Sequence, residues 1–348
     1  MSPLAHAEQK PHSDCATEAT NFLGKLTEVQ LKQAKWPFET KKRRKWTYFP
    51  NVPELDIRTE GLAVRDMTNT QRIEAHELIE CGLSNQGYQK AAAIMRMDDI
   101  LGQTDLYRPK TPEDDTVVDS EKYWLALFGD PTNSDTWGWQ LEGHHLALNF
   151  TVVDGKIIFA PAFMGADPAR VNAGRYAGWR ILGDEVDFAF QLLDSFDADQ
   201  IKQAIVNKEI PERLFTAPGR EDSLNTYLGI NASELNDAQL KLLTNLIETY
   251  VKNASAPIAL EHQNQILKYL PDETWFTWMG SNDPGNGIYY RIHSPAVLIE
   301  FVTARNRQSE AREPNPNHVH SIFAYPGNNY GDDYLRRHYQ LSKDHQDE

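Results

Sequence analysis

The chain has 348 residues, and its 35 Lys and Arg against 50 Asp and Glu give a formal net charge of −15. This acidic excess repels phosphate groups, so it argues against a nucleic-acid-binding protein and against a protein that binds anionic membrane surfaces. No stretch approaches the roughly 20 apolar residues of a membrane span, and 40% hydrophobic with 24% charged residues is an ordinary globular composition. A small molecule is therefore the partner that we expect.

The chain ends and the cysteines bear on domain organisation and on the cellular compartment. No basic segment followed by an apolar one opens the chain, so we expect no signal peptide. The two cysteines, Cys15 and Cys81, lack the spacing of a zinc-binding motif, and together these features favour the cytoplasm. No stretch rich in Pro, Gly or Ser divides the chain, so we expect flexible tails at residues 1–20 and 342–348 around one domain, 21–341.

Helical periodicity is clearest in the first third of the chain. Over residues 68–83, for example, Ile73, Leu78 and Ile79 recur at helical spacing. Asp197 is a natural N-cap for a helix in the second half. We expect helices over residues 21–35, 68–83, 87–101, 121–128, 184–196, 197–206 and 233–253.

The pattern changes to that of strands at Trp137. We expect one long strand over residues 137–152, a hairpin turn at Asp154-Gly155, and a returning strand over 156–161. Strands and helices come in blocks rather than as alternating βαβ units, so we expect an α+β fold. Its mostly antiparallel sheet would carry the histidine motifs, with helices packed around it. Further strands are expected over residues 275–279, 287–293, 296–302 and 318–324.

The segment His318-Val319-His320 is the clearest candidate for chemistry. Residues two apart on a strand face the same side of the sheet, so the two imidazoles would lie in parallel and could chelate one transition-metal ion. Two polar residues on a solvated sheet face would show the same spacing. Other ligands are needed to favour the metal.

A second pair, His144-His145, offers one further ligand. Strand alternation places His144 on the face of Gln140 and Glu142, and His145 on the opposite face. One of the two is expected to be a ligand, but the sequence does not decide which. A bulge at Gly143 would re-aim the chain and allow either.

The third candidate region combines a polar strand face with an isolated carboxylate. Glu300 interrupts an apolar strand, so it is either a third metal ligand or the partner of Arg291 in a salt bridge. Arg291 would bind a substrate carboxylate or phosphate through its planar fork. Tyr289, Tyr290 or His293 would act as the acid or base.

Four blocks of the sequence stand out together, namely residues 137–151 (WGWQLEGHHLALNFT), 161–169 (PAFMGADPA), 289–295 (YYRIHSP) and 317–320 (NHVH). In this order they resemble the uncharacterised "domain of unknown function 3500" family. The resemblance covers about residues 46–339 and supports one domain, but it implies no reaction. After Asn-His-x-His the family tends towards Trp-Arg-Asp, where this chain has Phe323-Ala324-Tyr325-Pro326, so the substrate here would differ if that Arg and Asp bind it.

These features predict a metal-dependent enzyme that acts on a small molecule, with an anionic substrate compatible with Arg291. The cofactor would be one ion of Fe, Cu or Zn. Oxidative chemistry with Fe or Cu is preferred, because a histidine-rich set with one carboxylate suits it. The alternatives are a zinc-dependent hydrolase or lyase, a metal-free hydrolase that uses His and Glu, and a non-catalytic protein that binds a small ligand.

Overall fold

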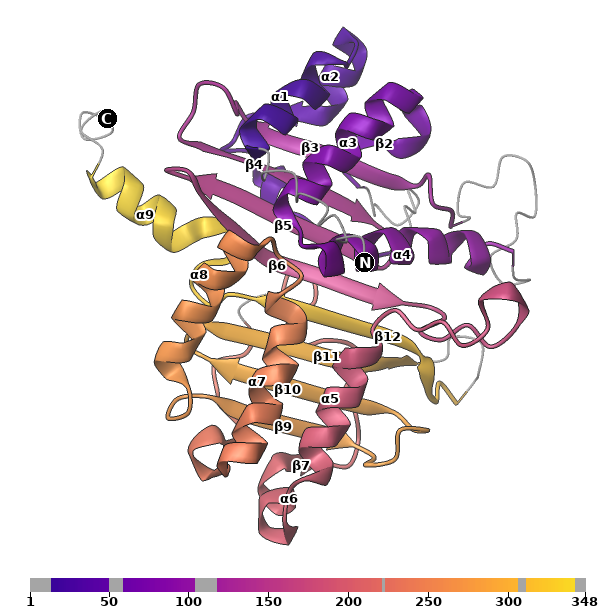
Figure 1. Ribbon diagram of the computed structural model, residues 1–348, viewed down its shortest axis with the longest axis vertical. Helices are drawn as coiled ribbons and strands as arrows, with labels where there is room; N and C mark the ends of the chain where they lie inside the picture. Colours follow the sequence, from indigo (N-terminus) through magenta and orange to yellow (C-terminus); the bar gives the residue numbers. More distant parts are fainter. Residues whose placement is uncertain (1–13, 50–58, 104–117, 221–222, 306–310, 342–348) are drawn as a thin grey trace, which may run out of the picture.

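The computed structural model describes residues 14–49, 59–103, 118–220, 223–305 and 311–341, and the account below concerns these residues (Figure 1). One sheet runs through the whole of this part, in the strand order β1-β3-β4-β5-β6-β12-β11-β10-β9-β7, with β2 paired to β3 and β8 to β9. Two pairings, β1 with β3 and β7 with β9, are parallel, and the others are antiparallel. The predicted α+β class with a mostly antiparallel sheet is confirmed.

The sheet is built from two runs of consecutive strands that meet where β6 pairs with β12. The strands of both runs are almost fully buried, because each face of the sheet is covered. Their bounds are β1 (Lys35–Trp36), β2 (Leu62–Ala63), β3 (Tyr123–Gly129), β4 (Thr136–Gly143), β5 (Leu146–Val153), β6 (Lys156–Ala166), β7 (Ile205–Asn207), β8 (Ile230–Asn231), β9 (Trp275–Gly280), β10 (Ile288–Ser294), β11 (Val297–Arg305) and β12 (Pro314–Ala324).

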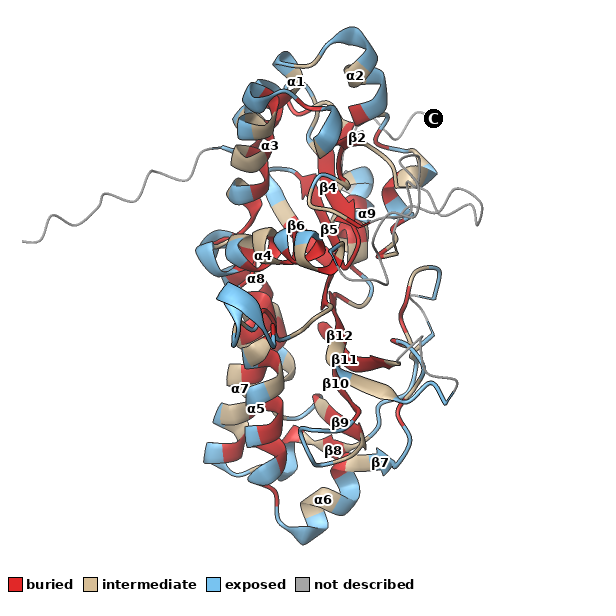
Figure 2. Cartoon of the chain, turned by 90° about the vertical axis from the view of Figure 1, so that its right-hand side faces the viewer, coloured by how far each residue is buried: buried red, intermediate tan, exposed pale blue. Residues whose placement is uncertain are grey.

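Helices cover one face of this sheet, here called the helix face (Figure 2). The expected N-cap is present, since the Asp197 side chain accepts from the backbone N–H of Asp199 and of Gln200. No helix in the described part is long and apolar enough to cross a bilayer. The helices are α1 (Cys15–Gly24), α2 (Glu28–Ala34), α3 (Asn69–Gly82), α4 (Asn85–Leu101), α5 (Gly183–Asp194), α6 (Ala198–Ala204), α7 (Asp237–Val251), α8 (Ala256–Ile266) and α9 (Asp332–Leu341).

The other face, here called the loop face, is covered mainly by irregular chain. Cross-strand pairing aligns one row of side chains along it, through six antiparallel pairs. A second hydrophobic cluster lies on this face, and it includes Tyr48, Phe163, Leu214 and Tyr289. The row consists of Glu142, Ala147, Phe163, Ile322, Glu300, Arg291 and Thr277.

Three local predictions differ from the structure, and two helices were missed. Residues 121–128 were expected to be helical, but β3 occupies them, because an apolar run buried on both sides suits a central strand as well as a helix. The expected long strand over 137–152 is a hairpin, with β4 and β5 joined at His144 and His145. The expected tail boundary at residue 20 lies inside α1. Helices α8 and α9 were not predicted.

The two cysteines form a disulfide between α1 and α3. Their Cα atoms lie 5.6 Å apart, across 66 positions of sequence. The wide spacing of the cysteines in the sequence did not exclude this pairing, and the cysteines no longer support a cytoplasmic location.

Candidate metal centre

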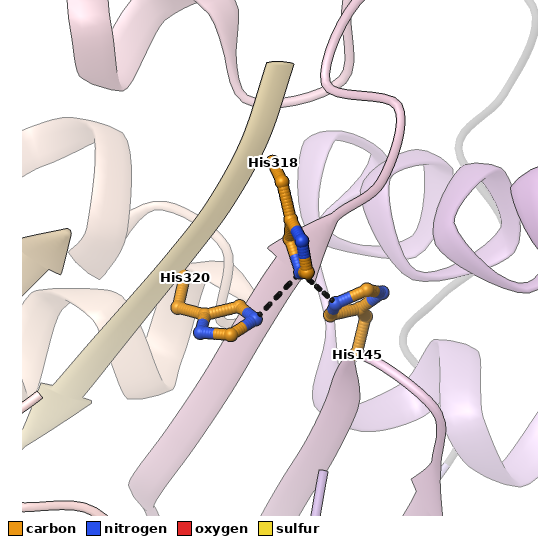
Figure 3. Close-up of side chains that lie close together, drawn as sticks. All are labelled: His145, His318 and His320. Carbon is orange, nitrogen blue, oxygen red and sulfur yellow. Dashed lines mark hydrogen bonds between the residues drawn. The ribbon is translucent and has the colours of Figure 1, made fainter. Parts of the chain in front are cut away.

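Three histidine side chains converge at the seam between the two runs of strands (Figure 3). Nε2 of His318 lies 2.9 Å from Nε2 of His145 and 3.0 Å from Nε2 of His320. All three residues have little exposure to solvent. As the strand spacing predicted, the rings of His318 and His320 lie on the same face of the sheet and point at one place.

His145 reaches this place because the chain reverses at it. Gly143 pairs with Leu146, so His144 and His145 form the turn of the hairpin. His145 adopts a left-handed backbone conformation with φ of 62°, which few residues other than glycine adopt. Its backbone N–H donates to the carbonyl of Tyr48, and its carbonyl accepts from the N–H of Gly165. The turn is therefore fixed from both sides.

A glycine in β6 makes room for the cluster. A Cβ atom at Gly165 would lie 2.9 Å from Cδ2 of His145 and 3.1 Å from Cδ2 of His320. It would also lie 2.9 Å from the carbonyl oxygen of Val319. Any larger residue here would push the rings apart, so the glycine is part of the site.

The three nitrogens suit a transition-metal ion. Imidazole nitrogens bind Zn, Cu and Fe, and nitrogens about 2.05 Å from a tetrahedral ion would lie about 3.3 Å apart. The spacings of 2.9 and 3.0 Å are close to that value. A carboxylate supports the set from outside, since Oδ2 of Asp167 lies 3.4 Å from Nδ1 of His318. Such a carboxylate fixes the tautomer that leaves Nε2 for the metal.

His144 points elsewhere. Its Nδ1 lies 2.8 Å from Oδ1 of Asp98, a residue of α4, and the Tyr123 hydroxyl donates to Oδ2 of the same carboxylate at 2.7 Å. Burial raises the pKa of the Asp98 carboxyl, and the neighbouring His144 opposes that change. The structure thus places His145 with His318 and His320, and His144 with Asp98. Asp98, His144 and His145 also form a second group close enough to hold an ion.

Aromatic rings form the loop-face side of the centre. The ring of His320 lies with its centroid 5.0 Å from that of Tyr48 and 5.5 Å from that of Phe163. Trp46 packs against Phe163 in turn. These rings exclude bulk water from one side of the cluster, which lowers the local dielectric.

Glu300 lies outside the three-histidine cluster. Its Oε1 accepts from the backbone N–H of Phe215 and from the hydroxyl of Tyr289, both at 2.9 Å. Its Oε2 accepts from the N–H and the hydroxyl of Thr216. Four donors thus hold this carboxylate against the covering segment. Neither the proposed ligand role nor a salt bridge to Arg291 within 4.0 Å is present in the described residues.

The three predicted catalytic residues divide between the two faces. Arg291 and His293 lie on the loop face, two residues apart on β10. Tyr290 lies on the helix face, where its hydroxyl is 2.5 Å from that of Tyr250 and 3.1 Å from the carbonyl of Glu185. Tyr290 therefore cannot act with the other two at one point.

Gln140 and Glu142 were expected on the same face as His144. They lie instead on the loop face, where Gln140 donates to the carboxyl of Glu142 and to the carbonyl of Lys45. Burial raises the pKa of Glu142 well above its usual range. The prediction assumed that side chains alternate between the two faces of the sheet as far as His144. Strand β4 ends at Gly143, so this alternation does not extend to His144.

Asp98, Asp167 and Tyr123 were not predicted as members of the site. Asp98 stands in an ordinary amphipathic helix, where a buried acidic residue has no distinctive pattern. Asp167 follows directly after β6, and the strand pairing that brings it to His318 links positions about 150 residues apart. The spacing of residues in the sequence therefore predicts neither the contact of Asp98 with His144 nor that of Asp167 with His318.

Comparison with known proteins places the chain in a family but not with a characterised relative. No curated protein and no solved structure matches it. One family model, described as "Protein of unknown function (DUF3500)", matches residues 8–332. This range includes both strand runs and all three histidines of the cluster. The chain therefore belongs to the DUF3500 family of proteins of unknown function.

Proposed function

We propose that this protein is a metal-dependent enzyme that acts on a small molecule, with one transition-metal ion held by His145, His318 and His320. The observation that carries the proposal is the convergence of three Nε2 atoms. Nε2 of His318 lies within hydrogen-bond distance of Nε2 of both His145 and His320. If this nitrogen carries a hydrogen, that hydrogen can point at only one of the two other rings. A cation between the rings would satisfy all three lone pairs at once.

Oxidative chemistry with Fe or Cu is the first candidate. Such an ion, when bound, activates dioxygen and accepts electrons from the substrate. The aromatic side formed by Tyr48 and Phe163 supports it, because dioxygen is apolar and enters apolar surroundings readily. In this scheme Asp167 orients His318, and the aromatic rings keep water away from the reacting atoms.

Zinc-dependent hydrolysis or addition of water is the second candidate. The observation that favours it is the composition of the ligand set, which is three neutral imidazoles without Glu300. Three histidines with an open fourth position are a known set for catalytic zinc, which supplies a water of lowered pKa. Glu300, the carboxylate on which the preference for oxidative chemistry rested, bonds instead to residues 215, 216 and 289.

Metal content is the first test. Protein purified without chelator should contain close to one equivalent of a single transition metal, and His318→Ala and His320→Ala should each lose most of it. His76→Gln is the matched control, because His76 lies on α3, away from the cluster. A wild-type protein that takes up no Fe, Cu or Zn, or histidine variants that bind as well as the control, would refute the proposal.

The nature of the metal then separates the two chemistries. Oxygen uptake that depends on added Fe or Cu, and that His318→Ala abolishes, supports oxidation. Turnover with Zn as the only metal rejects oxidation and supports the hydrolytic candidate.

The cytoplasmic location is likewise a proposal. The disulfide between Cys15 and Cys81 weighs against it, because the cytosol of most organisms keeps such pairs reduced. Fractionation of cells that express the full gene product decides it, and recovery outside the cytosol would reject it.

A further inference from the structure

Arg291 is buried with only part of its guanidinium paired. The residue is 1% exposed and bonds to the side chain of Tyr289, yet within the described residues both Nε and Nη2 lack a hydrogen-bond partner. A buried charge is costly unless it is paired and hydrogen-bonded. The described part of the chain holds no carboxylate within ion-pair distance of this guanidinium.

The nearest carboxylate along the row is Glu300, directly opposite on β11. Its two oxygens already accept from four donors, three of which belong to residues 215 and 216. Glu300 therefore fixes the covering segment, and Arg291 is left to bind something else.

The unpaired atoms define the shape of the missing partner. Nε–H and Nη2–H are the two parallel donors on one edge of the guanidinium, and they match the two oxygens of a planar carboxylate. A tetrahedral phosphate can also bind an arginine, but it presents more oxygens than this edge can satisfy. The edge therefore favours a carboxylate.

His293, two residues along the same face, has a second unpaired atom. Its Nδ1 has no hydrogen-bond partner in the part of the chain that the structure describes, while the ring bonds to the backbone of Thr226. Burial, together with Arg291, lowers the pKa of His293 to about 4, so the ring is neutral at pH 7. A neutral ring that donates from Nε2 to a carbonyl can only accept at Nδ1.

We propose that Arg291 binds the carboxylate of a small organic acid through Nε and Nη2, and that His293 accepts a hydrogen bond from a donor on that acid. A hydroxy acid has both groups. Entry would be from the side of Tyr227, which is exposed and whose ring lies 4.5 Å from that of His293.

The acid would lie on the same face of the sheet as the metal centre. His320 pairs with Val302 and Val302 with Tyr289, so Arg291 lies two strands away from His320 and two residues along β10. Strand spacing and rise put the two Cα atoms on the order of 12 Å apart on the same face. Naming the acid as substrate rests on the proposed function; the binding of the acid does not.

The experiment uses the full chain as purified, titrated in a calorimeter with lactate, propionate and inorganic phosphate. We expect saturable binding of lactate, weaker binding of propionate, and little binding of phosphate. Arg291→Met should abolish carboxylate binding, and Arg291→Lys should weaken it by about tenfold or more, because the forked geometry is lost. Absence of saturable carboxylate binding, or tighter binding of phosphate, would overturn the proposal. Equal binding of lactate and propionate would overturn the role of His293.

Thermal unfolding separates ligand binding from a structural role. Without ligand, Arg291→Met should melt at the same temperature as the wild type or higher, because it removes a buried charge that no carboxylate balances in the described residues. A lower melting temperature with unchanged carboxylate binding would show that Arg291 is structural and overturn the assignment. Arg291→Met should keep its metal, while His318→Ala should keep carboxylate binding, so the two proposals fail separately.

Discussion

Replacing both cysteines by serine should strongly destabilise this protein. The disulfide closes a loop of 66 positions between α1 and α3. In the chain-entropy model, a loop of this length contributes about 4 kcal/mol by restricting the unfolded state. We therefore expect Cys15→Ser/Cys81→Ser to lower the free energy of unfolding by about 4 kcal/mol.

The native contacts around the bond should survive the change. Ala19 and Phe22 of α1 are fully buried, so the helix stays docked and the loss falls on the unfolded state. Urea unfolding followed by far-ultraviolet circular dichroism gives the free energies, with reduced wild-type protein as the matched control. The reduced protein and the double variant should unfold together, at lower urea than the oxidised protein. Two titratable thiols in native protein purified without reductant, or a double variant as stable as the oxidised chain, would refute the reasoning.

Three further predictions concern single sites. Lys90→Met should cost about 3–5 kcal/mol of stability in urea unfolding, because it leaves the buried Glu185 without its cation; adding Glu185→Leu should recover most of this, and no recovery would contradict the pairing. Gly165→Ala should weaken metal affinity about tenfold or more by displacing the rings, which competition with a chelator measures; unchanged affinity would contradict it. Burial lowers the pKa of His262 from 6.5 to about 4, so the unfolded chain binds the extra proton first and stability falls as pH falls from 6.5 to 4, by about 3 kcal/mol. His262→Phe should flatten that part of the stability–pH curve, and an unchanged slope would contradict it.

Local periodicity was sufficient to predict most elements of the fold. Helices α3, α4, α5 and α7 and strands β9 to β12 lie close to the expected ranges, because amphipathic repeats and strand alternation are set by neighbouring residues. The Asp154-Gly155 turn was also predicted, since that pair favours the required backbone conformation. The helix predicted over residues 121–128 was wrong, because a short apolar run fits a buried strand and a buried helix alike.

The site was less accessible to sequence reasoning for a physical reason. His318 and His320 are related by a strand repeat, which is a local rule. The position of His145 depends on a reversal at Gly-His-His-Leu, whose two central residues are not ones that favour a tight turn and which requires a left-handed histidine. The contact of Asp98 with His144 depends on how α4 packs against the sheet. The separation of Glu300 from the cluster depends on how residues 215 and 216 fold over Glu300. These are tertiary contacts without a sequence period.

The pairing of β6 with β12 gives the metal centre a further consequence for folding. Each run of strands forms from neighbours in sequence, but this seam closes a loop of about 150 residues, so it carries a large entropic cost. His145 belongs to one run and His318 and His320 to the other. An ion that requires all three binds only after the seam has closed, and it stabilises the closed sheet by mass action. The metal would then link the two runs of strands, and its loss would favour opening of the sheet between β6 and β12.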